Sequence, residues 1–209
     1  MKKGLTLLEV LVAMFILVIV FGLVTFLYVK AASIRKIVVA NSEIQQTLSQ
    51  MMDTIIHGEK NTLGLCSAYH LNSAESNPNP SPPYKDVSHY VLVFSDKDAS
   101  NTGIYAIAPG ATAGNPSFSS TDTDTTLWRY DTTSGKWQSL DINNKITLVS
   151  GSKFDYYDSG GGNILDEHLD TETTLVKITL KAKSNEPALS NKAPVTLKTA
   201  IRLRNALPF

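Results

Sequence analysis

This chain of 209 residues has little cysteine, no formal net charge and no prominent cluster of basic residues. Cys66 is the single cysteine, which excludes a disulfide within the chain. We interpret it as a small buried hydrophobe, with an intermolecular disulfide or a reactive thiol as the alternatives. Lys and Arg number 19 and Asp and Glu number 19, so the formal net charge is zero. Because no basic patch stands out along the sequence, we predict no nucleic-acid partner.

Residues arranged for catalysis are missing as well. The four histidines are scattered without a metal-ligand spacing, and the sequence contains no P-loop, G-x-S-x-G or H-E-x-x-H motif. We therefore predict that the protein is not an enzyme and has no cofactor. Calcium is an alternative, with Asp155 and Asp158 before a glycine-rich turn as its first candidate ligands, although the segment does not fit an EF-hand loop.

The most prominent feature present is an apolar run at residues 10–29, which contains no charged side chain. About twenty apolar residues in a helix, rising about 1.5 Å each, span the hydrocarbon core of a bilayer. A secretory signal peptide has a shorter apolar region with its small-residue cleavage site after it. Here the small residue, Gly4, comes before the run. Cleavage between Gly4 and Leu5 would keep the apolar segment and create an amine about one helical turn from Glu9.

Glu9 directly precedes this apolar run, so a carboxylate lies next to a segment suited to the membrane. An ionised carboxylate in hydrocarbon is costly unless it is paired. If such N-terminal helices pack together in a filament, the N-terminal ammonium of a neighbouring subunit is a suitable partner, and Glu9 would then set the axial register of the subunits. The alternative is a bitopic anchor in which this first-turn residue only complements the helix dipole.

Residues 4–10, GLTLLEV, closely resemble the class III signal of type IV pilins and type II secretion pseudopilins. The resemblance implies that a prepilin peptidase cleaves between Gly4 and Leu5, that Leu5 is N-methylated, and that Glu9 acts in assembly. Other pilins or pseudopilins, an inner-membrane assembly platform and membrane lipid are the further partners it implies. It also implies a single-pass protein of the cytoplasmic (inner) membrane with an extracytoplasmic domain, which enters a cell-surface or periplasmic filament after assembly.

Two departures from the family pattern are visible. Leu5 stands where the family most often has Phe, and the helix lacks the frequent mid-helix proline. A helix without that proline is more common among pseudopilins and minor pilins.

Beyond the apolar run, the sequence predicts an α+β fold. No Gly or Pro occurs between Leu23 and His57, and apolar residues recur mostly three or four positions apart, which predicts an amphipathic helix that ends near Gly58. Antiparallel strands rich in β-branched and aromatic residues should pack on this helix, as in the pilin fold. The predicted strands cover residues 87–95, 103–108, 126–131, 136–140, 145–149, 153–157, 174–183 and 195–204.

These patterns divide the chain into consecutive segments. We predict a prepilin leader peptide at 1–4, a transmembrane and assembly helix at 5–29, the amphipathic half of the helix at 30–58, a variable loop at 59–86 and an antiparallel β globular domain at 87–209.

Several functions remain open from the sequence. Residues 195–205, VTLKTAIRLRN, resemble the last strand of J-type minor pseudopilins and W-type minor pilins, which lie near the filament tip and help to start assembly. A major or adhesive type IV pilin is one alternative. A membrane-anchored extracytoplasmic binding module that does not polymerise is a second, and a membrane-anchored enzyme is a third.

Overall fold

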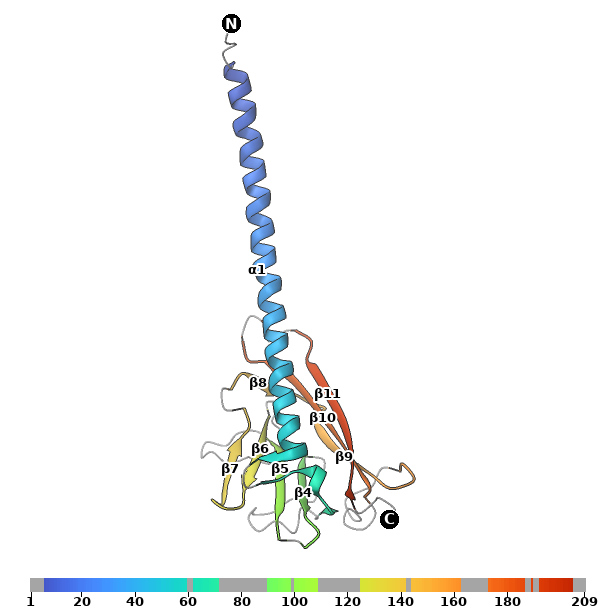
Figure 1. The fold of residues 1–209 in the computed structure, drawn as a ribbon. Coiled ribbons are helices and arrows are strands. Elements are labelled where there is room, and N and C mark those ends of the chain that lie inside the picture. The colour runs from blue at the N-terminus through green and yellow to red at the C-terminus, as the bar shows by residue number, and fades with distance from the viewer. Residues whose placement is uncertain are drawn as a thin grey trace. The chain divides into compact units, whose positions relative to one another are not determined.

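The computed structural model describes residues 6–59, 62–71, 90–98, 100–108, 125–141, 144–162, 173–186, 189 and 192–204. The chain divides into two compact units, Met1–Ser42 and Glu43–Phe209. One helix, α1, extends over Leu7–His57 and contributes to both (Figure 1). It ends at Gly58, whose φ of 77° is a left-handed conformation that glycine adopts without strain, as the sequence predicts for a C′ residue.

In the second unit, one face of α1 is buried. Its core positions follow the spacing of a single helix face and are at most 5% exposed: Ile44, Leu48, Met51, Met52 and Ile55. The predicted amphipathic stripe is therefore buried from Ile44 onward. Ile34 and Val38, which the same periodicity includes, belong to the first unit and are 62% and 60% exposed.

The strands form two main antiparallel sheets and one short ribbon (Figure 1). The five-stranded sheet has the order β3 (His70–Leu71), β4 (Val91–Ser95), β5 (Thr102–Ala108), β6 (Thr126–Asp131), β7 (Lys136–Ser139). The other contains β8 (Ile146–Leu148), β9 (Lys153–Tyr157), β10 (Leu175–Ser184) and β11 (Val195–Arg202), with β10 pairing all three others. The predicted α+β class is confirmed, and the antiparallel strands divide between two main sheets.

The two main sheets meet at a bridge between Thr125 and Leu148. The backbone N–H of each residue donates to the carbonyl of the other, at 3.1 and 2.7 Å. Both sheets contribute to one hydrophobic core with α1, and its buried members from the strands include Leu92, Phe94, Tyr105, Leu127, Phe154, Tyr156, Val176, Ile178 and Leu180. The core therefore holds the C-terminal half of α1 against both sheets.

Short elements occupy part of the segment for which the sequence predicts a loop, 59–86. They are β1 (Gly58–Glu59), β2 (Thr62–Leu63), the 3-10 helix η1 (Leu65–Ser67) and β3. Residues 60, 61 and 72–86 of that segment lie outside the described residues. The pairing of β3 with β4 adds this short strand to one edge of the five-stranded sheet.

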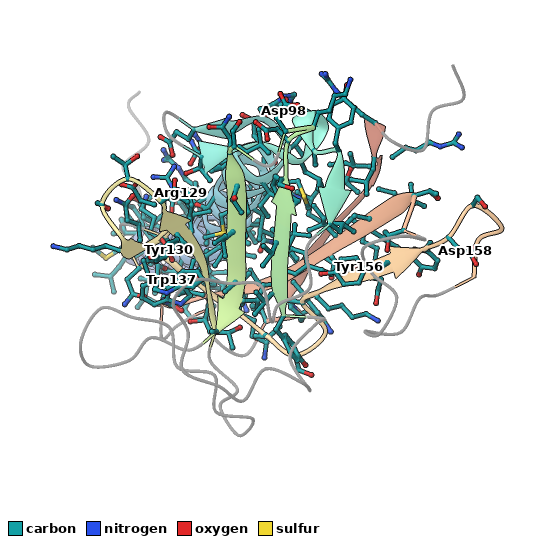
Figure 2. All side chains as sticks on the ribbon, turned by 90° about the horizontal axis from the view of Figure 1, so that it is seen from below. Asp98, Arg129, Tyr130, Trp137, Tyr156 and Asp158 are labelled. Atoms are coloured by element: carbon teal, nitrogen blue, oxygen red, sulfur yellow. The ribbon has the colours of Figure 1, made fainter. Side chains whose placement is uncertain are left out.

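Asp131 shapes the turn of the predicted β6–β7 hairpin. Its carboxylate accepts the Ser134 hydroxyl at 2.8 Å and the Thr133 N–H at 2.9 Å. The Ser134 hydrogen bond is the main cause that lowers the pKa of Asp131 below its ordinary value. Beyond the turn, the rings of Tyr130 and Trp137 meet edge to face at 5.3 Å (Figure 2). The local turn chemistry and the aromatic pair together fix the register Asp131↔Lys136.

Candidate assembly site

The start of α1 is closed by a reciprocal pair of residues, Thr6 and Glu9. The Thr6 N–H and the Thr6 hydroxyl both donate to Glu9 Oε2, at 2.9 and 3.0 Å. In return, the Glu9 N–H donates to Thr6 Oγ1 at 3.3 Å. This is a capping box, in which the N-cap and the third helical residue each satisfy a backbone N–H of the other.

The capping box uses only one oxygen of the Glu9 carboxylate. Both bonds that Glu9 accepts end on Oε2. Among the described residues, Oε1 has no hydrogen-bond partner. The helix therefore orients the carboxylate while leaving an acceptor for a second donor.

The helix surface that follows Glu9 is apolar and uncovered. An 18-residue window of α1 has a mean hydropathy of 3.1 and none of it is buried, so the helix is long and apolar enough to cross a membrane. The polar Thr25 does not interrupt this surface, because its hydroxyl donates to the Phe21 carbonyl at 2.8 Å. Such a surface needs lipid or other apolar helices around it.

The predicted processing residues, Gly4 and Leu5, lie outside the described residues. The first described residue is Thr6, the N-cap of α1. Cleavage and methylation at Gly4 and Leu5 therefore stay predictions. The Thr6–Glu9 pair is the part of the predicted site whose geometry the structure gives.

The C-terminal end of α1 is held by hydrogen bonds within the second unit. The Tyr105 hydroxyl donates to the Thr54 carbonyl, in the last turn of the helix, at 2.9 Å. Arg129 donates to Glu59, just beyond the helix, at 2.6 Å and to Gln138 at 2.7 Å. Burial raises the pKa of Tyr105 above its ordinary value, so its hydroxyl stays a donor.

The two calcium candidates have other bonds. Asp155 Oδ1 lies 2.8 Å from the ammonium of Lys153, and that hydrogen bond raises the pKa of Lys153. Asp158 lies in the turn after β9 (Figure 2), and its Oδ1 accepts the Gly162 N–H at 2.8 Å. In the described part of the chain, no group of three or more His, Cys, Asp or Glu is arranged to hold a metal.

Cys66 is half-buried rather than buried as the sequence suggested. Its Sγ lies 3.8 Å from His57 Nδ1, next to the end of α1. No sequence motif indicates this neighbour, because nine residues separate the two side chains.

Sequence reasoning identified Glu9 but overlooked the cap partner. The pattern T-x-x-E before an apolar run is a capping-box signature, so Thr6 could have been assigned as the N-cap. Tyr105 and Arg129 carry no such signal, because their partners lie 51 and 70 residues away.

Residues 1–25 match the family model described as "Prokaryotic N-terminal methylation motif". No curated protein and no solved structure matches the chain. The motif is the class III prepilin signal, found in structural subunits of the type IV pilin and pseudopilin family and recognised by the prepilin peptidase. Together with the apolar helix it indicates anchoring in the inner membrane before assembly.

Proposed function

We propose that this pilin-like chain is a minor, tip-proximal subunit that helps to start assembly of a type IV pilus or a type II secretion pseudopilus. The assembly role rests on the Glu9 carboxylate at the start of an exposed apolar helix. Within the described residues, only Oε2 of this carboxylate accepts hydrogen bonds. The minor role rests on the resemblance of residues 195–205, which contain β11, to the last strand of J-type and W-type subunits. Retention of Glu9 argues against the terminal tip pilin, which often lacks it.

The proposed sequence of events begins at the membrane. A prepilin peptidase cleaves between Gly4 and Leu5 and methylates the new N-terminal amine of Leu5. Thr6 then directly follows the new terminus. The amine carries the positive charge that Glu9 of another subunit needs in an apolar surrounding.

The geometry at Glu9 supports pairing across subunits. Glu9 is held by Thr6 through Oε2, so Oε1 can accept a hydrogen bond from the methylated ammonium of a neighbour. A subunit docked at another height leaves both charges unpaired, at a cost of several kcal/mol. The exposed apolar helix supplies packing area, and the pair supplies the register. Other pilins or pseudopilins and an inner-membrane assembly platform are the proposed partners.

Mass spectrometry of the N-terminus of the protein purified from cells tests the processing step. We expect an N-methylated Leu5 for the wild type and an intact leader for Gly4→Leu, because a bulky side chain replaces the small residue at the cleavage site. An intact Met1 in the wild type, or cleavage after the apolar run, would contradict the proposal.

The copy number in purified filaments tests the minor role. A minor initiating subunit should be present in few copies for each filament, and its deletion should reduce filament number. A chain that makes up most of the filament mass would instead be a major pilin. A processed chain that is absent from filaments would support the binding module that does not polymerise.

A further inference from the structure

Strands β10 and β11 carry basic side chains on the face of their sheet that points away from the core. In β10, Val176, Ile178 and Leu180 are completely buried, so the alternating side chains lie on the opposite face. On that opposite face, β10 carries Lys177, Lys181 and Lys183 and β11 carries the exposed Lys198 and Arg202.

Strand β9 extends the same surface. Lys153 pairs with Thr179 of β10 and is exposed, so it lies on the outer face as well. We define the basic face as the six residues Lys153, Lys177, Lys181, Lys183, Lys198 and Arg202. Among the described residues of β8 to β11, Asp155 is the one carboxylate on this face; it is 4% exposed and bonded to Lys153.

The strand register arranges five of these cations in a continuous line. Lys198 lies opposite Thr179, and is therefore the diagonal neighbour of both Lys177 and Lys181. Arg202 lies opposite Leu175, which makes it the diagonal neighbour of Lys177. Diagonal neighbours in a sheet are about 7–8 Å apart. The line Arg202, Lys177, Lys198, Lys181 therefore has regular steps, and Lys183 continues it along β10 by about 7 Å.

The described strands give the basic face a net positive charge. It carries six cations and one carboxylate, an excess of five positive charges. A surface with such an excess attracts a polyanion.

Two ordinary explanations account for only part of the pattern. Lysines often protect an edge strand from pairing with other chains, which explains Lys198 and Arg202 on β11. The strand β10 is paired on both sides, so Lys177 and Lys181 have no edge to protect. A protein partner is a poor fit, because Lys is depleted at the cores of protein interfaces. Within the described residues, none of the five cations in the line forms a salt bridge.

We propose that the basic face is a docking surface for the phosphate backbone of double-stranded DNA, which it binds without reading the base sequence. Duplex DNA carries one negative charge for about every 1.7 Å of its axis, so a regular line of cations can lie along its phosphates. Lys side chains act here as flexible point charges that position the duplex rather than specify its sequence. This activity goes beyond the assembly role and does not depend on it.

The sequence alone predicts no nucleic-acid partner, because these cations do not cluster along the chain. They alternate with apolar residues and are distributed from position 153 to position 202. Only the antiparallel pairing of β9, β10 and β11 brings them onto one surface.

The test is the binding of the full-length chain, in non-ionic detergent, to a fluorescent duplex of about 30 base pairs at several NaCl concentrations. We expect micromolar affinity at low salt, with log K falling linearly with log salt concentration. Lys177→Glu/Lys198→Glu should weaken binding by about tenfold or more and reduce the salt slope by about two, because two phosphate contacts are lost. No salt-dependent binding by the wild type would overturn the proposal.

Matched variants distinguish the effect of the basic face on binding from the effects of net charge and of misfolding. Lys97→Glu/Lys136→Glu makes the same charge change at two exposed residues, one in the turn after β4 and one in β7, and should leave the affinity within about twofold. Lys177→Gln/Lys198→Gln should leave β10 and β11 folded and should reproduce the reduced dependence of log K on log salt concentration. Equal weakening by the Lys97/Lys136 pair would overturn the proposal.

The same measurement discriminates among anionic partners. Vesicles that contain phosphatidylglycerol and a poly-glutamate peptide serve as the other two probes. Tighter binding of either probe than of the duplex, lost in Lys177→Glu/Lys198→Glu, would overturn the assignment to DNA. Preference for the duplex over both supports it.

Discussion

Thr6 and Glu9 hold each other at the first turn of α1, with the Thr6 N–H and hydroxyl both directed at Glu9 Oε2 and the Glu9 N–H directed at Thr6 Oγ1. The cap and the proposed pairing across subunits therefore use different parts of one side chain. The two roles do not compete, because Oε1 stays available while Oε2 caps the helix. This arrangement makes it possible to remove the charge and the cap separately.

The first prediction concerns the charge of Glu9. Glu9→Gln keeps a side chain that can complete a capping box but removes the negative charge. We expect the variant to be processed and membrane-bound, while its incorporation into filaments falls by about tenfold or more because the neighbour's ammonium loses its partner. Immunoblots of sheared filaments and of the membrane fraction measure the two pools.

The matched control removes the cap and keeps the charge. Thr6→Val deletes the hydroxyl and should cost about 1 kcal/mol at the helix start, measured as faster hydrogen exchange of the Glu9 amide, which donates to that hydroxyl. Incorporation should stay within about twofold of wild type. If Glu9→Gln assembles normally and Thr6→Val does not, Glu9 acts only as a cap.

The second prediction concerns calcium. The Asp155 carboxylate is bonded to Lys153 and Asp158 Oδ1 accepts the Gly162 N–H, and two carboxylates supply fewer oxygens than the six to eight of a calcium shell. Addition of millimolar calcium or of a chelator should leave the Tm of the protein within about 1 °C. A Tm that rises with calcium, and no longer does so in Asp158→Asn, would show that the turn after β9 binds the ion.

The third prediction concerns the close approach of Gly64 to the end of α1. A side-chain carbon at Gly64 would collide with the backbone of His57 and Gly58. The φ of Gly64 is −92°, which any residue adopts, so the constraint is steric and not conformational. Gly64→Ala should therefore lower the free energy of unfolding by about 2 kcal/mol or more, measured by chemical denaturation.

Gly160→Ala is the control for this steric argument. An added carbon at Gly160 would meet only Asp158 Oδ1, at 3.4 Å, in an exposed turn. Its effect should stay within about 0.5 kcal/mol. Equal destabilisation by the two variants would show that the packing of Gly64 on the helix end does not limit stability.

The sequence predicted the strands well where the evidence is local. All eight predicted strands correspond to β4 through β11, because each is rich in β-branched and aromatic residues and is bounded by Gly, Asn, Asp or Pro. The strands β1, β2 and β3 were missed, because each has two residues and so no detectable periodicity. The partition into two sheets depends on long-range pairing, which the sequence does not encode in any short window.

In the candidate site, too, the local features could be predicted from the sequence and the long-range contacts could not. Glu9 stands out from the sequence because a carboxylate beside an apolar run is unusual, and its cap partner is three residues away. The hydrogen bonds at the C-terminal end of the helix could not be predicted from the sequence. Tyr105 and Thr54 are 51 residues apart, and Arg129 and Glu59 are 70 residues apart. Such contacts arise only once the sheet has packed on the helix.

The last prediction concerns the Tyr105 hydroxyl, which donates to the Thr54 carbonyl at 2.9 Å. Tyr105→Phe leaves that carbonyl without this donor and should lower the free energy of unfolding by about 1–2 kcal/mol at pH 8. Burial raises the pKa of Tyr105 in the folded state, whereas the unfolded residue titrates near its ordinary value of about 10. The folded state thus holds the phenolic proton more tightly than the unfolded state.

The sign of the pH dependence follows from this difference. The contribution of Tyr105 to stability is fully present below about pH 10, the unfolded pKa, and declines as the pH rises toward the folded value. Wild type should therefore lose stability above pH 10 faster than Tyr105→Phe, and the difference between them should shrink. Denaturation of both proteins at pH 8 and at pH 11 measures this change. A difference that is independent of pH would show that Tyr105 titrates equally in the folded and unfolded states, contrary to its burial against the helix end.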